Sequence, residues 1–404
     1  MSARMNFGLM KISLQLIKNG GYKVTNTLTN DRSEHQIDYR FKILYAVGIL
    51  MVLCGHCEGG GISLSLADWF PYAGLHVALF VFCSGYFYKS EAEENVPGYL
   101  WKKIKTLIIP LYLYNIAYGV IVQISQIKYF KIGGEFTLYN LFVAPIIDGH
   151  QFEYNLAGWF IMPLFMVQVL NILYRKVLKK ICKNIPEALF FVIGIALGLI
   201  GNLLACKGYN TGWWLALVRM LHFMPFYSLG IFYNRTLEKY ERKIPGILYF
   251  AVIMGIKLAL TYHYGKFLVY TPSWCNDFAE GPLMPIIVGY LGIAMWMRIA
   301  TVLEPVVGKN KYVNLLADNT YSIMMNQFLG FMIVKTIYGV CAKLFPVFTD
   351  FDFVSYENNL WWYYTPQRIG YTRIFYLLAA IIFSVCVQYA INFVKDKYRK
   401  MKGI

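Results

Sequence analysis

The chain has 404 residues, of which 58% are apolar, 18% aromatic and only 15% charged. An average soluble domain is about 45–50% apolar and about 25% charged, so this composition excludes a cytosolic enzyme, a nucleic-acid-binding protein, a disordered chain and a small disulfide-bonded scaffold. The formal net charge is +16. In a soluble protein such a charge would suggest nucleic acid as a partner, but the placement of the basic residues gives a better account.

Ten apolar segments are long enough to cross a bilayer core of about 30 Å, which takes roughly 20 helical residues. In chain order they are 41–57, 68–88, 104–124, 157–174, 187–206, 212–234, 245–263, 281–303, 317–344 and 373–394. The strict alternation of β-barrel strands is absent. We therefore predict an all-α membrane protein with about ten transmembrane helices, in which every backbone group is bonded within its own helix.

The loops between these segments predict the orientation. Most of the 38 Lys and Arg residues fall in the two terminal regions and in alternate loops, whereas the remaining loops hold only Lys128, Lys131, Lys207, Lys266, Arg368 and Arg373. Basic loops stay in the cytoplasm, so both termini are predicted to be cytoplasmic, which requires an even number of spans. The chain is thus expected to be a multi-pass protein of the cell membrane whose excess positive charge reflects insertion and attraction to anionic lipids.

Three regions follow from this topology: a cytoplasmic tail at 1–36, a transmembrane domain at 37–396 and a basic cytoplasmic tail at 397–404. No small-residue cleavage site precedes the first apolar segment, so a cleavable signal peptide is not expected. The two longest outer loops, 125–156 and 345–372, are rich in aromatic residues. An aromatic belt at the membrane surface explains them, and stacking on a sugar face is the alternative.

Ionisable side chains within the spans are costly, and each is a functional hypothesis. At about 1.5 Å per residue, His56, His76 and Arg219 come out roughly 18–22 Å from the inner side, and His222 follows one turn after Arg219. Each histidine alone could simply bond a neighbouring carbonyl. The convergence of side chains from three helices in one layer favours a site. Lys335 is also deep in its span but is assigned no role.

Cys54 and Cys57 flank Gly55-His56 with the spacing of a redox motif. Redox cysteines of this kind open a helix beside a βαβ sheet, whereas here they end a membrane helix. Buried cysteine commonly behaves as a small apolar residue, which is the interpretation we favour. A zinc site would need further ligands at fixed spacing, and no metal is predicted.

Two motifs carry a resemblance to a known family. Residues 40–56 read RFKILYAVGILMVLCGH and residues 76–87 read HVALFVFCSGYF. The first resembles the opening helix of the acyltransferase-three family, closest to its fucose 4-O-acetylase-like group, in which Val-Val-Leu-Gly-His ends that helix. The second is similar to the family's His-x-x-Leu-Phe-Phe-x-x-Ser-Gly-Tyr-x-Phe. Weaker similarities follow in order at Trp159-Phe160, 224–230 and 319–324.

The resemblance implies an integral membrane O-acyltransferase acting on a cell-surface or lipid-linked glycan, with acetyl-CoA or another acyl-CoA as donor substrate and no bound cofactor. Its partners would be membrane lipids, the acyl-CoA and the glycan, and no nucleic acid. His56 is expected to be the general base, with His76 and Arg219 as further catalytic residues. Arg219 or an amide could stabilise the oxyanion. The expected substrate-binding residues are Lys42, Tyr45, Ser84, Trp159, Asn326 and Gln327, and Lys102, Lys103 and Lys105 could join Lys42 in holding the donor's phosphates.

Two positions depart from the family's pattern. Tyr45 stands where the family usually has Arg or Lys, eleven residues before the motif histidine, and shares a helix face with His56. Lys42 lies within about 40° of that face and could replace the missing cation. Gln327 stands where the ninth helix usually carries a histidine, and because glutamine cannot carry a proton at neutral pH, a mechanism with two histidines is weakened.

Two other classes of protein also fit many helices and aromatic outer loops: a glycan transporter or flippase, and a polysaccharide polymerase. Transporters often show internal repeats and broken helices, and no convincing repeat is found in this sequence. The pairing of Gly55-His56 with Ser84-Gly85 favours the acyltransferase, because neither alternative requires it.

Overall fold

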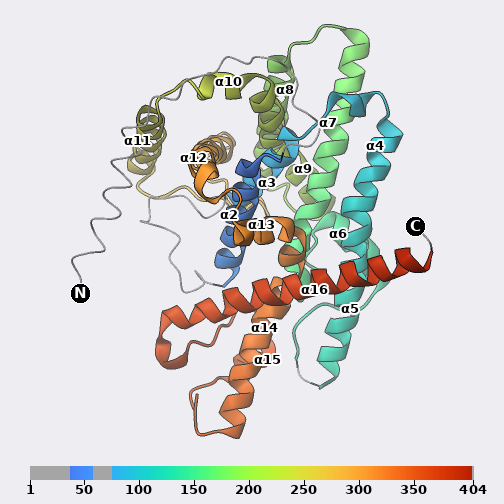
Figure 1. Ribbon diagram of the computed structural model, residues 1–404, viewed down its shortest axis with the longest axis vertical. Helices are drawn as coiled ribbons and strands as arrows, with labels where there is room; N and C mark the ends of the chain where they lie inside the picture. Colours follow the sequence, from blue (N-terminus) through green and yellow to red (C-terminus); the bar gives the residue numbers. More distant parts are fainter. Residues whose placement is uncertain (1–36, 58–74, 129, 403–404) are drawn as a thin grey trace. The chain divides into compact units, whose positions relative to one another are not determined.

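The computed structural model describes residues 37–57, 75–128 and 130–402, and this part of the chain is helical without any β-strand (Figure 1). It contains nine helical segments long and apolar enough to cross a membrane, together with a shorter apolar helix at His76–Tyr86. That short helix belongs to the predicted second span, whose residues 68–74 lie outside the described residues, as does the predicted tail at 1–36. The prediction of an all-α protein with about ten membrane helices is confirmed.

The unit Tyr39–Ile404 is built from helices with the following bounds: α2 (Tyr39–His56), α3 (His76–Tyr86), α4 (Val96–Lys103), α5 (Ile109–Lys128), α6 (Ala144–Ile147), α7 (Ile161–Ile181), α8 (Glu187–Cys206), α9 (Gly212–Phe232), α10 (Glu238–Glu241), α11 (Gly246–Tyr264), α12 (Met284–Val307), α13 (Lys311–Asp318), α14 (Thr320–Leu344), α15 (Phe353–Asn358) and α16 (Ile374–Met401). A π-helical turn, Ile104–Ile108, joins α4 to α5, and a 3₁₀ segment, Glu153–Phe160, leads into α7. The two predicted outer loops therefore contain short helices, and α16 continues across the predicted start of the basic tail.

Local sequence signals account for several helix ends. Asn95 caps α4 by accepting a hydrogen bond from the backbone N–H of Gly98 at 3.0 Å, with Pro97 in the first turn. Asn310 caps α13 in the same way, accepting from two backbone N–H groups. Gly265 ends α11 in the left-handed region with φ = +65°, a conformation that glycine adopts without steric cost.

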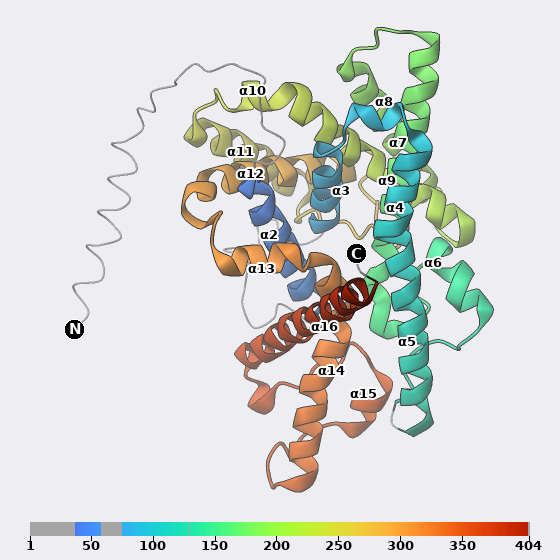
Figure 2. The same cartoon turned by 45° about the vertical axis from the view of Figure 1, so that its right-hand side comes forward.

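Small residues set the packing of the central helices. Helix α9 packs against both α3 and α8, and α14 crosses and packs against α16 (Figure 2). A Cβ atom at Gly85 would collide with the backbone carbonyl of Tyr227, and one at Gly230 with that of Phe82. The backbones of α3 and α9 thus approach at a distance that only glycine permits, as in many membrane helix pairs. This explains the glycine of the Ser84-Gly85 motif.

A buried ionic network holds the N-terminal end of α2 in place. Arg40 pairs with Glu238 at 2.9 Å, and the hydroxyl of Tyr86 donates to the same carboxylate at 2.8 Å. Because each charged group has a partner, its burial is tolerated. The network ties α2, α3 and α10 together and thereby positions the two motif helices relative to each other.

Candidate active site: two adjoining cavities

A cavity of about 260 Å³ lies where α2 ends and α3 begins. We call it the histidine cavity because His56 and His76 both line it. Its other walls come from the Glu153–Phe160 segment, from Met324 on α14 and from the loop between α11 and α12; the remaining lining residues are Val52, Gly55, Val77, Phe80, Ala157, Trp159, Phe160, Val269, Tyr270, Thr271, Pro272 and Ser273. The structure therefore brings together two of the three predicted catalytic residues.

The imidazole of His56 is oriented by a side chain of α14. Its Nδ1 lies 2.9 Å from Oε1 of Gln327, while Nε2 of Gln327 donates to the backbone carbonyl of Met324 at 2.9 Å. The second bond fixes which end of the amide faces the histidine. Because the amide oxygen can only accept, Nδ1 of His56 must carry the proton, and Nε2 keeps its lone pair. Gln327 thus fixes a neutral His56 in the tautomer whose Nε2 can accept a hydrogen bond or a proton.

The aromatic loop before α16 reaches the same histidine. The hydroxyl of Tyr363 donates to the backbone carbonyl of His56 at 2.5 Å, and the ring of Trp361 lies 5.8 Å from the His56 ring. Lys335 is fully buried, lies 4.5 Å from the centroid of the Tyr363 ring and donates to the carbonyl of Leu360. Lys335 therefore fastens this loop beside the end of α2, a role that the sequence did not suggest.

His76 lines the histidine cavity and has a ring nitrogen without a hydrogen-bond partner in the part of the chain that the structure describes. Its Nδ1 is buried and has no hydrogen-bond partner among the described residues. A buried polar atom without a partner costs free energy, so it is a natural contact for a bound hydroxyl or carbonyl. The neighbouring side chains of Cys54 and Cys57 are buried, and the two are not joined in a disulfide.

Arg219 does not line the histidine cavity, but it contacts segments that do. Its guanidinium donates to the backbone carbonyls of Ser273 and Asp148, the latter at 2.9 Å, and lies 4.8 Å from the centroid of the Trp159 ring. These contacts tie three separate segments to α9. Trp159 lines the cavity, so Arg219 acts on this site through Trp159 and the loop that contains Ser273.

An aromatic stack continues from Trp159 away from the cavity. The ring of His150 lies 4.3 Å from that of Trp274 at an interplanar angle of 17°, and 6.4 Å from that of Trp159. His150 lies in a loop outside the membrane spans, and burial, together with the nearby charge of Arg219, lowers its pKa to about 3. It is therefore neutral at physiological pH and packs as an aromatic ring.

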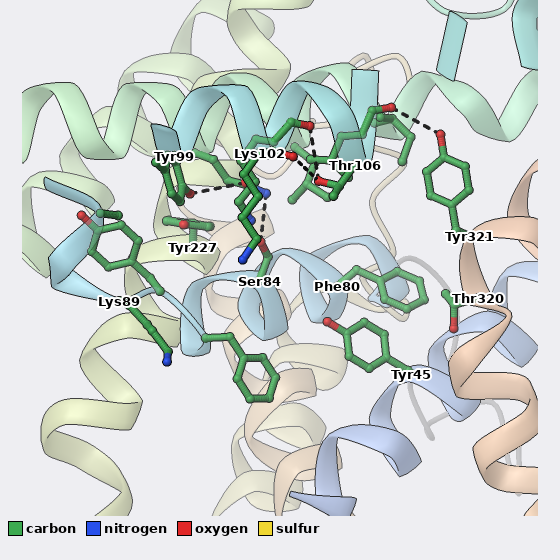
Figure 3. Close-up of a pocket in the computed structure, with 18 of the residues that line it drawn as sticks. Tyr45, Phe80, Ser84, Lys89, Tyr99, Lys102, Thr106, Tyr227, Thr320 and Tyr321 are labelled. Carbon is green, nitrogen blue, oxygen red and sulfur yellow. Dashed lines mark hydrogen bonds between the residues drawn. The ribbon is translucent and has the colours of Figure 1, made fainter. Parts of the chain in front are cut away.

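A second, larger cavity of about 790 Å³ adjoins the first (Figure 3). We call it the basic cavity because Lys89, Lys102 and Lys103 line it. Figure 3 shows Tyr45, Phe80 and Ser84 on α2 and α3, facing Tyr99, Lys102 and Thr106 on the helix opposite. The hydroxyl of Ser84 accepts a hydrogen bond from Nε2 of Gln168 at 3.0 Å. Polar groups from α2, α3, α4 and α7 thus line one space together with the three lysines.

The other lysines expected to hold the donor's phosphates lie elsewhere. Lys42 pairs with Asp318, and it is Asp318, not Lys42, that lines the basic cavity. The ammonium of Lys105 lies 5.0 Å from the centroid of the exposed Trp101 ring and lines neither cavity. Lys89 was not assigned to this task from the sequence, although its place directly after the second motif was a usable signal.

Three side chains line both cavities: Phe80, Phe160 and Met324. We call them the apolar wall. Since each touches both spaces, the wall lies between the cavity lined by Ser84 and Tyr45 and the cavity lined by His56 and His76. The spacing on α2 produces this arrangement, because Tyr45 and His56 share a face of that helix and lie about three turns apart.

Comparison with known protein families gives a match over nearly the whole sequence. A family model described as an acyltransferase domain matches residues 38–393. The chain belongs to the acyltransferase-three family. It is therefore a multi-pass membrane protein with an acyltransferase domain. The comparisons with curated proteins and with solved structures found no match.

Two further residues that the sequence singled out, Asn326 and His222, lie outside both cavities. Asn326 donates to Ser322 and accepts from the hydroxyl of Tyr118 at 2.9 Å, so it joins α14 to α5. His222 is hydrogen bonded through Nδ1 to Asn202 at 2.7 Å and lies beside a much smaller space. Both side chains are hydrogen bonded to neighbouring residues, and for His222 this is the simpler of the two interpretations that the sequence allowed.

The loop between α11 and α12 was missed by the sequence reasoning. Residues 269–273 form part of the histidine cavity, and Arg219 anchors them. The loop is shorter than the two aromatic loops that drew attention, and its residues Thr271-Pro272-Ser273 carry no recognisable motif. Only the deep position of Arg219, which needs partners in the membrane, pointed towards it.

Proposed function

We propose that this acyltransferase moves an acetyl or similar short acyl group from a cytosolic acyl-CoA to a hydroxyl of a cell-surface or lipid-linked glycan, in the cell membrane and with both termini cytoplasmic. The observation that carries the proposal is the orientation of His56. Its Nδ1–H is held by Gln327 beside a cavity, which leaves Nε2 as the acceptor for a hydroxyl proton.

The chemistry requires a base because a sugar hydroxyl is a weak nucleophile at neutral pH. Nε2 of His56 takes the hydroxyl proton while the oxygen attacks the thioester carbonyl, so that a C–O bond forms. The C–S bond then breaks, and the leaving thiolate takes the proton from the imidazolium. The atoms balance without any metal or redox partner, and the free Nδ1 of His76 offers one further polar contact to the reacting groups.

The donor fits the basic cavity. Coenzyme A carries several phosphate charges, and Lys89, Lys102 and Lys103 line the space that adjoins the histidines. These lysines belong to segments that the positive-inside rule assigns to the cytoplasm, where acyl-CoA is made. Tyr45 and Ser84 would then contact the part of the donor that is nearer the thioester.

The acceptor fits the histidine cavity and the aromatic loop beside it. Trp361 is 48% exposed although its ring lies within 6 Å of His56, and Trp159 lines the cavity itself. Exposed aromatic faces beside a base suit a sugar ring. The closeness of Trp361 to His56 is what supports the stacking interpretation for this residue.

The experiment that tests the proposal is mass spectrometry of the surface glycan from cells with the gene, without it, and with His56→Ala in its place. We expect glycan of full length that lacks the mass of one acyl group per repeat in the second and third samples. A glycan that is absent or shortened would point to export or polymerisation instead. The family match does not favour those alternatives.

A further inference from the structure

The apolar wall is made of two rigid side chains and one adaptable side chain. The Phe80 and Phe160 rings lie 6.1 Å apart at 56°. Phe80 is also held against α2, where a Cβ atom at Gly48 would come within 2.9 Å of its ring. Met324 completes the wall from α14. Methionine is unbranched and adapts to the shape beside it, so Met324 is the part of the wall that can yield.

The wall lies between the two groups that the reaction must connect. The lysines that suit the donor's phosphates line one cavity, and His56 lines the other. The thioester carbonyl must nevertheless come within bonding distance of the hydroxyl that His56 activates. The acyl end of the donor therefore has to pass between Phe80, Phe160 and Met324, while the charged phosphates and the polar sugar stay on their own sides.

We propose that the apolar wall sets the upper size of the acyl group, admitting acetyl and excluding longer chains; this rests on the proposed function. The three side chains are only 7–8% exposed, and each of them borders both cavities. A small apolar group passes between them at low cost, because it gives up little hydration. A longer chain must displace packed rings, and close packing resists even one additional methylene.

The wall can be altered without disturbing the base. The hydrogen bond that links Met324 to the base through Gln327 is accepted by its backbone carbonyl and not by its side chain. Met324→Ala keeps that carbonyl and removes only the side chain. Phe160→Leu widens the wall from another segment. Phe82→Leu is the matched control, because Phe82 is fully buried on the same helix as Phe80 but lines neither cavity.

The test uses the full chain in lipid nanodiscs, with membranes of the producing cells as acceptor. Thiol release and incorporation of labelled acyl groups are measured for acetyl-, propionyl- and butyryl-CoA. We expect the wild type to prefer acetyl-CoA. Met324→Ala and Phe160→Leu should raise the butyryl-to-acetyl ratio of kcat/KM about tenfold or more, the usual discrimination for one methylene in an apolar site. Phe82→Leu should leave the ratio unchanged.

The outcomes separate this inference from the proposed function. A wild type that transfers acetyl and butyryl groups equally well would overturn the inference alone. So would an unchanged ratio in both widened variants, provided that size-exclusion chromatography shows folded protein. Failure of the wild type to transfer any acyl group from CoA would overturn the proposed function and, with it, the role of the wall.

Discussion

The basic cavity and the histidine cavity differ in how their polar groups are held. In the basic cavity the charges are at the ends of long side chains, and Lys89 and Lys102 are exposed. In the histidine cavity His56 is fixed by Gln327, and its surroundings are tied down by Arg219 and Lys335. Flexible cations suit the capture of a mobile polyanion, whereas a base must be held in one orientation to accelerate a reaction. Substitutions in the two cavities should therefore affect different kinetic constants.

The largest effect is expected at His56. His56→Ala removes the proton acceptor and should reduce kcat about 10³-fold, within the usual range for general-base catalysis, with little change in the KM for acyl-CoA. Thiol release from acetyl-CoA measures both constants. The matched control is His263→Ala, since His263 lies exposed at the end of α11 and lines neither cavity. A His56→Ala variant with normal kcat would show that the histidine cavity is not the reaction site.

Gln327 should come next, because it acts through His56. Gln327→Leu removes the acceptor of the Nδ1 proton and should lower kcat roughly 30-fold, as expected for a lost hydrogen bond to a group that becomes charged. Gln327→His restores the family's residue, which can still accept at one ring nitrogen, and should keep most of the activity. The acid limb of the pH–rate profile should move only in the leucine variant. A loss of protein stability without that movement would assign Gln327 a purely structural role.

A substitution at Arg219 can distinguish two roles of this residue. It either holds Trp159 and the loop that contains Ser273 in place, or it stabilises the oxyanion. Arg219→Lys keeps the charge but cannot reach both the Ser273 and Asp148 carbonyls. We expect a roughly tenfold rise in the KM for the acceptor and about 2 kcal/mol lower stability, the cost of an unsatisfied buried group. Thermal unfolding and acceptor titration measure the two effects. A fall in kcat at unchanged stability would instead support the oxyanion role inferred from the sequence.

In the basic cavity the effect should be smaller and should appear in KM. Lys102→Ala and Lys103→Ala are each expected to raise the KM for acyl-CoA about fivefold, near 1 kcal/mol, as for exposed charge pairs. The effect should shrink as salt is added. Lys180→Ala is the control, because this exposed lysine of α7 lies outside both cavities. If kcat fell instead of KM rising, the two cavities would not divide binding from chemistry.

The sequence predicted the helices well because membrane helices must be continuous and apolar. The predicted segment 187–206 is α8 itself, and most other boundaries differ by a few residues. The third segment extends further at both ends than predicted, because hydropathy does not detect a helix that continues beyond the lipid. The aromatic loops contain α6 and α15, which are too short to give a periodic signal.

The site was only partly predictable for a different reason. His56, His76, Ser84 and Trp159 come from motifs, and all four line a cavity. The pairing of Gln327 with His56 joins residues far apart in the chain, which hydropathy and depth cannot register. Depth predicted Arg219 in the layer of the histidines but gave no information on the direction in which its side chain points.

The smallest effect on the KM for acyl-CoA is expected at Lys42. This residue also gives the most sensitive test of how the basic cavity captures its donor. The sequence suggests it as a substitute for the family's cation at Tyr45, whereas the structure pairs it with Asp318 at the edge of the basic cavity. Because that pairing already neutralises its charge, Lys42→Ala should raise the KM for acyl-CoA by less than about twofold, as for most exposed ion pairs. Asp318→Asn removes a negative charge beside the donor's phosphates and frees Lys42, so it should lower the same KM by about twofold. Opposite signs in the two variants mean that Asp318 limits donor capture. A large rise in Lys42→Ala would instead assign Lys42 to the donor directly, as the sequence suggests.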